Sequence, residues 1–89
     1  MVFVNNFVLI RTYTAGVHYG ILQSKNGKEV VLTKSRRIWS WSGALSLNEI
    51  AVNGVDLANS RISVPADAVL LTECIEVLLI SSSSNLPRG

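Results

Sequence analysis

The sequence predicts a mainly β domain of the α+β type, and three observations support this fold class. Most of the chain consists of short apolar, β-branched runs separated by glycine-containing turns. Asn26-Gly27 is a strong signal for a hairpin turn. One helix start stands out, at residues 46–49. The expected architecture is a small antiparallel β-sheet or an SH3-like, partly open barrel, with one short helix around residues 46–52.

The first predicted hairpin has apolar strands on either side of residues 15–16. A two-residue loop at residues 15–16 would place Tyr13 opposite His18. Because side chains alternate along a strand, Arg11, Tyr13 and His18 would then share one polar face. The opposite face is expected in the core and consists of Val8, Ile10, Thr12, Tyr19 and Ile21.

A second hairpin is expected around Asn26-Gly27, leading into a strand over residues 29–33. A two-residue loop would place Lys25 opposite Lys28, and this like-charge contact favours a longer loop. The next segment, residues 36–42, alternates between two sides. One side is predicted to be basic and aromatic and consists of Arg37, Trp39 and Trp41. The other side consists of Arg36, Ile38, Ser40 and Ser42.

Ser46 and Glu49 have the spacing of a capping box, in which each residue satisfies a free backbone N–H of the other at a helix start. Asn53-Gly54 is expected to end this helix. Residues 66–80 fit either two strands or one helix, and the β-branched and leucine-rich end of the segment favours strands. We expect one β-rich domain over residues 1–80. The polar, serine-rich residues 81–89 are predicted to form a flexible C-terminal tail.

The composition is apolar for a chain of 89 residues, with 48% hydrophobic and 16% charged side chains. A single domain of this size buries a modest share of its surface, so some apolar surface is expected to meet another copy of the chain. Basic side chains gather before residue 38 and acidic ones after it. Such a bipolar chain pairs its own halves or stacks on a copy of itself. We therefore expect a homo-oligomer.

The sequence indicates a cytoplasmic protein. The first ten residues lack the features of a signal peptide, and no apolar run is long enough to span a membrane. Cys74 is the single cysteine, which excludes an internal disulfide. Because it lies in an apolar run, we expect its thiol to be a small buried side chain.

The residues predict no enzyme, no cofactor and no metal site. His18 is the single histidine, and neither Cys74 nor any serine has the sequence context of an activated nucleophile. One histidine without clustered carboxylates has no metal-ligand spacing. The glycine-rich phosphate-binding motifs are also missing.

A basic, aromatic surface remains the candidate ligand site, since arginine pairs with phosphate and aromatic rings stack on bases. Alternating tryptophans are more often core or interface residues, and the arginines also have internal acidic partners available. The net charge of +2 is low for a protein that binds nucleic acid through its backbone, so nucleic acid is not the expected partner. The candidate ligand-binding residues are Arg11, Tyr13, His18, Arg36, Arg37, Trp39 and Trp41.

Three segments carry a family resemblance: residues 10–20 (IRTYTAGVHYG), 36–44 (RRIWSWSGA) and 69–77 (VLLTECIEV). They resemble a family of small proteins of tailed bacteriophages and prophages, over roughly residues 7–80. Cys74 stands where the family pattern leads us to expect alanine, which suggests a small buried side chain.

The resemblance implies a non-enzymatic phage accessory protein, and such proteins often counter bacterial defence. By analogy we expect an oligomer that sequesters a nucleotide-derived immune signal, such as a cyclic oligonucleotide or a cyclic ADP-ribose. This ligand would be a nucleotide-like small molecule. Two alternatives are a protein that binds and inhibits a host defence enzyme and a small β-barrel that binds nucleic acid.

Overall fold

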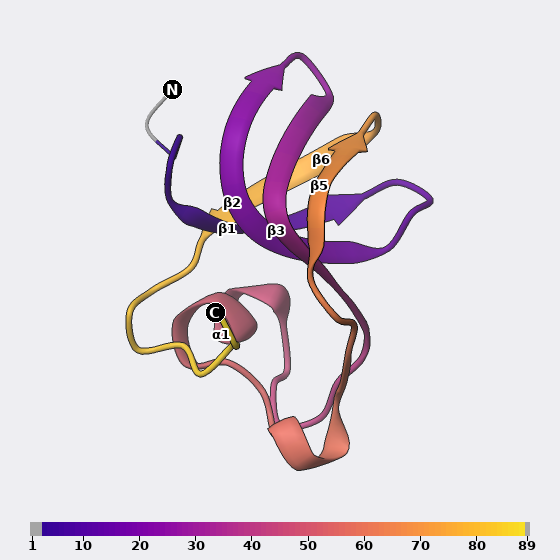
Figure 1. The fold of residues 1–89 in the computed structure, drawn as a ribbon. Helices are drawn as coiled ribbons and strands as arrows, with labels where there is room; N and C mark the ends of the chain where they lie inside the picture. Colours follow the sequence, from indigo (N-terminus) through magenta and orange to yellow (C-terminus); the bar gives the residue numbers. More distant parts are fainter. Residues whose placement is uncertain (1–2, 89) are drawn as a thin grey trace.

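The computed structural model describes residues 3–88 and confirms the mainly β fold class (Figure 1). One antiparallel sheet has the strand order β4-β3-β2-β1-β6, and β5 pairs with β3 beside β4. The strands are β1 (Phe7–Thr12), β2 (Val17–Asn26), β3 (Glu29–Ser40), β4 (Arg61–Ile62), β5 (Ala66–Leu71) and β6 (Cys74–Leu79). The helical elements are α1 (Leu47–Asn53) and the single 3₁₀ turn η1 (Leu57–Asn59). Among the described residues, no helix is long and apolar enough to cross a membrane.

The sheet curves because β5 and β6, which lie at opposite edges of the sheet, follow each other directly in the chain. β5 pairs with β3 and β6 pairs with β1, yet two residues alone join β5 to β6. Figure 1 shows β5 and β6 side by side at the turn that joins them. Residues 66–80 thus form two strands, as predicted, and the helical alternative does not occur. The result is one curved, open antiparallel sheet.

A β-bulge in β3 allows this curvature. Tyr19 pairs with Arg36 and Ile21 pairs with Thr33, so two residues of β3, Lys34 and Ser35, lie opposite Gly20 alone. The site requires glycine, because a Cβ at position 20 would lie 2.7 Å from the Thr33 carbonyl oxygen. Lys34 adopts a left-handed backbone with φ of +51°. The bulge divides β3 into a half that pairs with β5 and a half that pairs with β4.

The predicted register of the first hairpin is wrong. Ile10, and not Tyr13, pairs with His18, and Arg11 pairs with Val17. Residues 13–16 form a longer loop in which Gly16 has φ of +85° and its carbonyl accepts from the backbone N–H of residue 12. The predicted two-residue loop would require positive φ at alanine as well, which a Cβ disfavours. The shift changes which side chains share a face.

The second hairpin lies where Asn26-Gly27 predicts it, with its register moved by one residue. Asn26 pairs with Glu29, so the loop consists of Gly27 and Lys28. Gly27 has φ of +61°, as expected at the first central position of a type II′ turn. Lys25 pairs with Val30 in this register. The like-charge pairing of Lys25 with Lys28 is thereby avoided.

Both faces of the sheet are covered. One core cluster lies inside the curved sheet and consists of Val8, Ile10, Leu22, Val30, Leu32, Leu71 and Cys74. The other lies where α1 and the C-terminal residues cover the sheet, and it consists of Leu9, Tyr19, Ile38, Ile50, Ala51, Val55, Ile80 and Leu86. Adjacent residues 8–10 of β1 are therefore all buried, on alternating faces. A strand between two apolar layers reads as a continuous apolar run.

The helix begins where the capping signal predicts it. Ser46 is the N-cap and its side chain accepts from the Glu49 backbone N–H at 3.3 Å. The Glu49 carboxylate accepts from the Leu45 backbone N–H at 3.0 Å, one residue earlier than a capping box requires. Gly54 closes the helix with φ of +89°.

The C-terminal residues differ from the predicted flexible tail, because residues 81–88 dock beside α1 (Figure 1). Leu86 is 3% exposed and belongs to the core cluster under the helix. The Ser84 hydroxyl donates to the Ile50 carbonyl, and the Asn85 side chain bonds both the N–H and the C=O of Val55. The polar composition that suggests disorder here supplies hydrogen bonds to the helix and the residues that follow it.

Tyr19 joins this segment to the sheet and makes a testable prediction. Its hydroxyl donates to the Pro87 carbonyl at 2.7 Å, and burial raises its pKa to about 12 from 10.0. Tyr19→Phe should lower the free energy of unfolding at pH 8 by about 0.5–1.5 kcal/mol, the contribution of one hydrogen bond. The tyrosine is neutral in the fold and ionises first in the unfolded chain, so wild-type stability falls as pH rises from about 10 to about 12.

Urea unfolding of wild type and Tyr19→Phe at pH 8 and pH 11 measures both effects. The stability gap between the two proteins should narrow at pH 11, because the phenylalanine variant lacks this ionisation. An equal gap at both pH values would contradict the assignment.

Candidate functional site

A cavity of about 260 Å³ opens between β2, the bulged part of β3 and the start of β5. We call it the Arg37 cavity. It brings together three of the predicted site residues, His18, Arg37 and Trp39. Its full lining is His18, Ser35, Arg37, Trp39, Ser63, Val64, Ala66 and Val69.

Arg37 and Trp39 reach the cavity because β3 alternates as predicted after its bulge. Ile38 between them is 2% exposed and lies in the core, whereas Trp39 is 59% exposed. The backbone of Arg37 is held by Ser63, whose hydroxyl accepts from the Arg37 N–H at 2.8 Å and whose N–H donates to the Arg37 carbonyl at 2.9 Å. Within residues 3–88 the Arg37 guanidinium makes no hydrogen bond or ion pair. The cation is thus positioned by its backbone and available to a ligand.

His18 forms an inner wall of the cavity and is 3% exposed. One ring nitrogen, Nε2, lies 3.0 Å from the Ala15 carbonyl oxygen and donates to it. Burial lowers the pKa of the imidazole, and the nearby Arg37 charge lowers it further, while the Ala15 bond opposes both. The ring is therefore neutral at neutral pH. Its other nitrogen, Nδ1, is an acceptor without a hydrogen-bond partner among the described residues.

Ser35 is the second buried polar residue of the cavity and is 4% exposed. Its hydroxyl, like His18 Nδ1, has no hydrogen-bond partner in the described part of the chain. Neither atom is fully enclosed, since Arg88 Nε is the single sealed and unpartnered side-chain atom of residues 3–88. Both atoms therefore face open space. Water can therefore reach both atoms, and a ligand in the cavity could take the place of that water.

The side chains of the cavity suit a flat ligand that carries an anion. A guanidinium forms two parallel bonds to a phosphate or carboxylate, and a tryptophan face stacks on an aromatic ring. Ser35 adds a donor and the neutral His18 adds an acceptor. Val64 and Val69 supply an apolar wall. Among the described residues, the Ser35 hydroxyl and the His18 ring make no hydrogen bond to each other.

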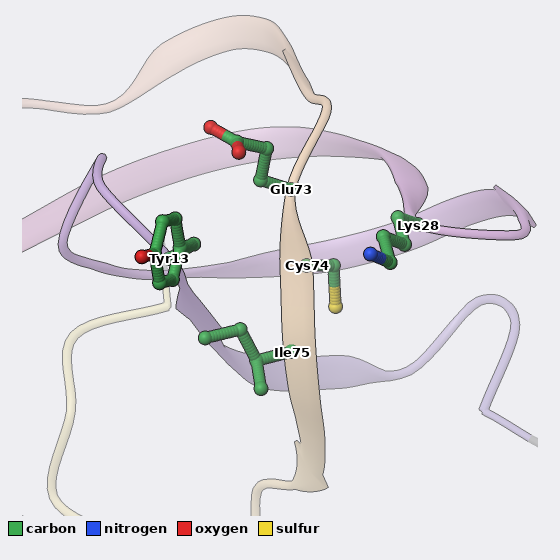
Figure 2. A pocket seen from close by; sticks show the side chains of 5 residues that line it. All are labelled: Tyr13, Lys28, Glu73, Cys74 and Ile75. Atoms are coloured by element: carbon green, nitrogen blue, oxygen red, sulfur yellow. The ribbon is translucent and has the colours of Figure 1, made fainter.

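A separate cavity of about 490 Å³ lies where the two hairpin loops meet the β5–β6 turn (Figure 2). Figure 2 shows Tyr13 and Lys28 on opposite sides of the segment from Glu73 to Ile75. Its polar groups are better satisfied, since the Glu73 carboxylate accepts from the Thr14 hydroxyl at 3.0 Å. Its charged side chains, Lys28 and Glu73, are exposed and of opposite sign. We therefore place the candidate site at the Arg37 cavity.

Cys74 in this second cavity is buried, as predicted. The thiol is 7% exposed and contributes to the core inside the sheet. Burial raises its pKa, so the thiol stays protonated at neutral pH. This supports a packing role for Cys74.

The other predicted site residues are not brought together with the Arg37 cavity. Arg11 is exposed on the sheet face opposite Ile10 and His18, because the hairpin register differs from the predicted one. Tyr13 is in the loop and lines the second cavity. The predicted shared face of Arg11, Tyr13 and His18 is therefore wrong.

Arg36 and Trp41 also lie outside the cavity lining. Arg36 donates to the Ser63 carbonyl at 3.2 Å and its charge acts on Tyr19, which places it toward the face covered by the C-terminal residues. Trp41 follows β3 and is 36% exposed. Neither tryptophan is a core residue.

The sequence pattern did not point to Ser35 or Ser63. Ser35 reaches the cavity through the bulge. Ser63 reaches it because it directly follows β4, which pairs with β3, and bonds the backbone of Arg37. A signal for the bulge was present in Gly20, a glycine inside a strand, which often marks a close backbone approach.

Residues 3–88 contain no group of three or more histidine, cysteine, aspartate or glutamate side chains that could hold a metal ion.

Comparisons with known proteins complete this description. Neither the curated proteins nor the solved structures contain a match to the chain. A family model described as a domain of unknown function, DUF6948, matches residues 5–85. This match covers both hairpins, the Arg37 cavity and the docked C-terminal residues up to Asn85. The chain therefore belongs to the DUF6948 family.

Proposed function

We propose that this protein is a non-enzymatic binding domain that holds a nucleotide-like, phosphate-bearing small molecule in the Arg37 cavity. The observation that carries the proposal is that Ser35, His18 and Arg37 line one cavity and each has a polar atom without a hydrogen-bond partner among residues 3–88. Ser35 and His18 are each more than nine-tenths buried, and both line the cavity. An anion beside them would also neutralise the Arg37 guanidinium.

The exposed Trp39 ring supports a nucleotide over a bare anion. A sugar phosphate needs the cation and the hydroxyl group, whereas a nucleobase also gains from stacking, by about 1–3 kcal/mol per base. The neutral His18 Nδ1 accepts a hydrogen bond, so it favours a ligand that carries an N–H or O–H donor near its anionic group.

The phage resemblance suggests a biological role for this ligand. It implies that the protein sequesters a nucleotide-derived immune signal, of the cyclic oligonucleotide or cyclic ADP-ribose type, as a homo-oligomer. The large apolar side chains that line the cavity and are exposed support assembly, since Val64 is 83% exposed and Trp39 is 59% exposed. Covering them with a second copy would also make the cavity deeper.

Calorimetric titration tests the proposal with a panel of nucleotides: AMP, cyclic dinucleotides, cyclic trinucleotides and cyclic ADP-ribose isomers. At least one should bind to wild-type protein at pH 7. Ser35→Ala should weaken that binding about tenfold, the value of one hydrogen bond to a charged group. Ser82→Ala, at an exposed serine outside the cavity, is the matched control and should bind as wild type does.

Absence of binding to every member of the panel would overturn the proposal. A stable complex with a bacterial protein in that case would favour the protein-inhibitor alternative. Salt-sensitive binding of random oligonucleotides would favour the nucleic-acid alternative.

A further inference from the structure

A third cavity adjoins the Arg37 cavity along the start of β5. Its volume is about 440 Å³ and its lining is Thr33, Lys34, Pro65, Ala66 and Asp67. Ala66 lines both cavities, and Lys34 precedes Ser35 of the Arg37 cavity in the bulge. The two cavities therefore share one lining residue, Ala66. We call the second one the Lys34 cavity.

The Arg37 cavity alone is small for a nucleotide-sized ligand. Sites for small molecules commonly measure about 300–1,000 Å³, and the Arg37 cavity measures about 260 Å³. The two adjoining cavities together fall well within that range. A ligand seated at Arg37 thus has room to continue over Ala66.

Lys34 has a strained backbone at the point where a ligand would arrive. It is one of two non-glycine residues with positive φ among residues 3–88, the other being Asn5. A left-handed backbone is costly for a lysine, whereas glycine or asparagine adopts it readily. Since lysine gives no conformational advantage at this position, its charge is the remaining property that a site could use.

We propose that the ligand carries a second anionic group, which lies across Ala66 and binds the Lys34 ammonium. This inference rests on the proposed function and specifies its ligand class as a nucleotide with two separate phosphate groups. Asp67 lines the same cavity and repels an anion. The second phosphate therefore lies on the Lys34 side, and the Asp67 carboxylate is left to accept from a sugar hydroxyl or from water.

The test compares AMP with adenosine 3′,5′-bisphosphate, which differs by one phosphate, by titration at low salt. Wild-type protein should bind the bisphosphate at least tenfold more tightly than AMP. Lys34→Asn should reduce that ratio to about one and leave AMP binding within twofold, because asparagine keeps the left-handed backbone and so preserves the positions of Ser35 and Arg37. Lys28→Asn removes a lysine outside both cavities and should leave the ratio unchanged.

A second variant separates a ligand role from a folding role. Lys34→Gly should raise the melting temperature by a few degrees, through relief of strain, while it abolishes the preference for the bisphosphate. Asp67→Asn should strengthen bisphosphate binding, because it removes the charge that repels the second phosphate.

The outcomes distinguish this inference from the proposed function. Binding of AMP with no preference for the bisphosphate, or a preference that survives Lys34→Asn, overturns the two-phosphate ligand and leaves the Arg37 site standing. Failure of wild-type protein to bind every nucleotide in both sets overturns the proposed function and this inference together.

Discussion

Replacing Leu86 with alanine is expected to lower the free energy of unfolding by about 2–5 kcal/mol. Leu86 is 3% exposed and packs in the cluster that α1 shares with the sheet, against residues such as Ile50 and Leu9. The substitution removes this apolar contact and leaves a cavity under the helix. Stabilities of small domains are about 5–15 kcal/mol, so the loss is a large share of the total.

Urea unfolding at pH 7 measures the loss, and Ser82→Ala is the matched control in the same segment. Ser82 is exposed, so its removal should change stability by less than about 0.5 kcal/mol. If Leu86→Ala unfolds at the same urea concentration as wild type, the segment does not dock in solution and the predicted flexible tail is the better description.

The strands were predictable wherever local signals and burial agree. Asn26-Gly27 marks a hairpin because glycine supplies the positive φ that its turn requires, and Gly27 has φ of +61°. The alternation of Arg37, Ile38 and Trp39 holds because Ile38 is needed in the core beneath β3. In this alternating segment one face is buried and the other is exposed, and this difference fixes the register of the strand.

The first hairpin shows where such local signals fail. Residues 8–10 of β1 are apolar and buried on both faces of the sheet. The apolar pattern of this strand therefore does not specify its pairing register with β2. Loop length then decides the register, and alanine-glycine is a weak signal for it. A shift by an odd number of residues moves Arg11 to the face opposite His18. The sequence thus predicted the part of the candidate site that lies on β3. The predicted site residue on β1, Arg11, is not part of the cavity.

The bulge and the C-terminal docking depend on contacts between distant residues. Ser35 reaches the cavity because Lys34 and Ser35 lie opposite Gly20, a tertiary feature that the residues 33–37 do not encode alone. Residues 84–86 are ordered by partners at residues 50 and 55, and their own composition is that of a disordered segment. The composition of a segment does not show which backbone N–H and C=O groups elsewhere in the chain need a hydrogen-bond partner.

Arg37→Ala is expected to weaken binding of the nucleotide by about a hundredfold, which corresponds to about 3 kcal/mol. The guanidinium makes no hydrogen bond within the described residues, so its full capacity for a two-bond contact is available to a phosphate. Arg37→Lys keeps the charge and loses the fork-shaped pair of donors, so an intermediate loss of about tenfold is expected. Arg11→Ala, on the opposite face of the sheet, is the matched control and should bind as wild type does.

Two further readouts separate a binding role of Arg37 from a role in folding. The melting temperature of Arg37→Ala should match that of wild type, because Ser63 bonds the Arg37 backbone and these bonds survive the substitution. The pKa of His18, followed by NMR, should rise in the variant, because the Arg37 charge that lowers it is gone. Unchanged affinity in Arg37→Ala, or an equal loss in Arg11→Ala, would remove the Arg37 cavity as the binding site. Weakened binding with unchanged stability is the result expected of a ligand contact at Arg37, and the raised His18 pKa shows that the charge was removed beside the cavity.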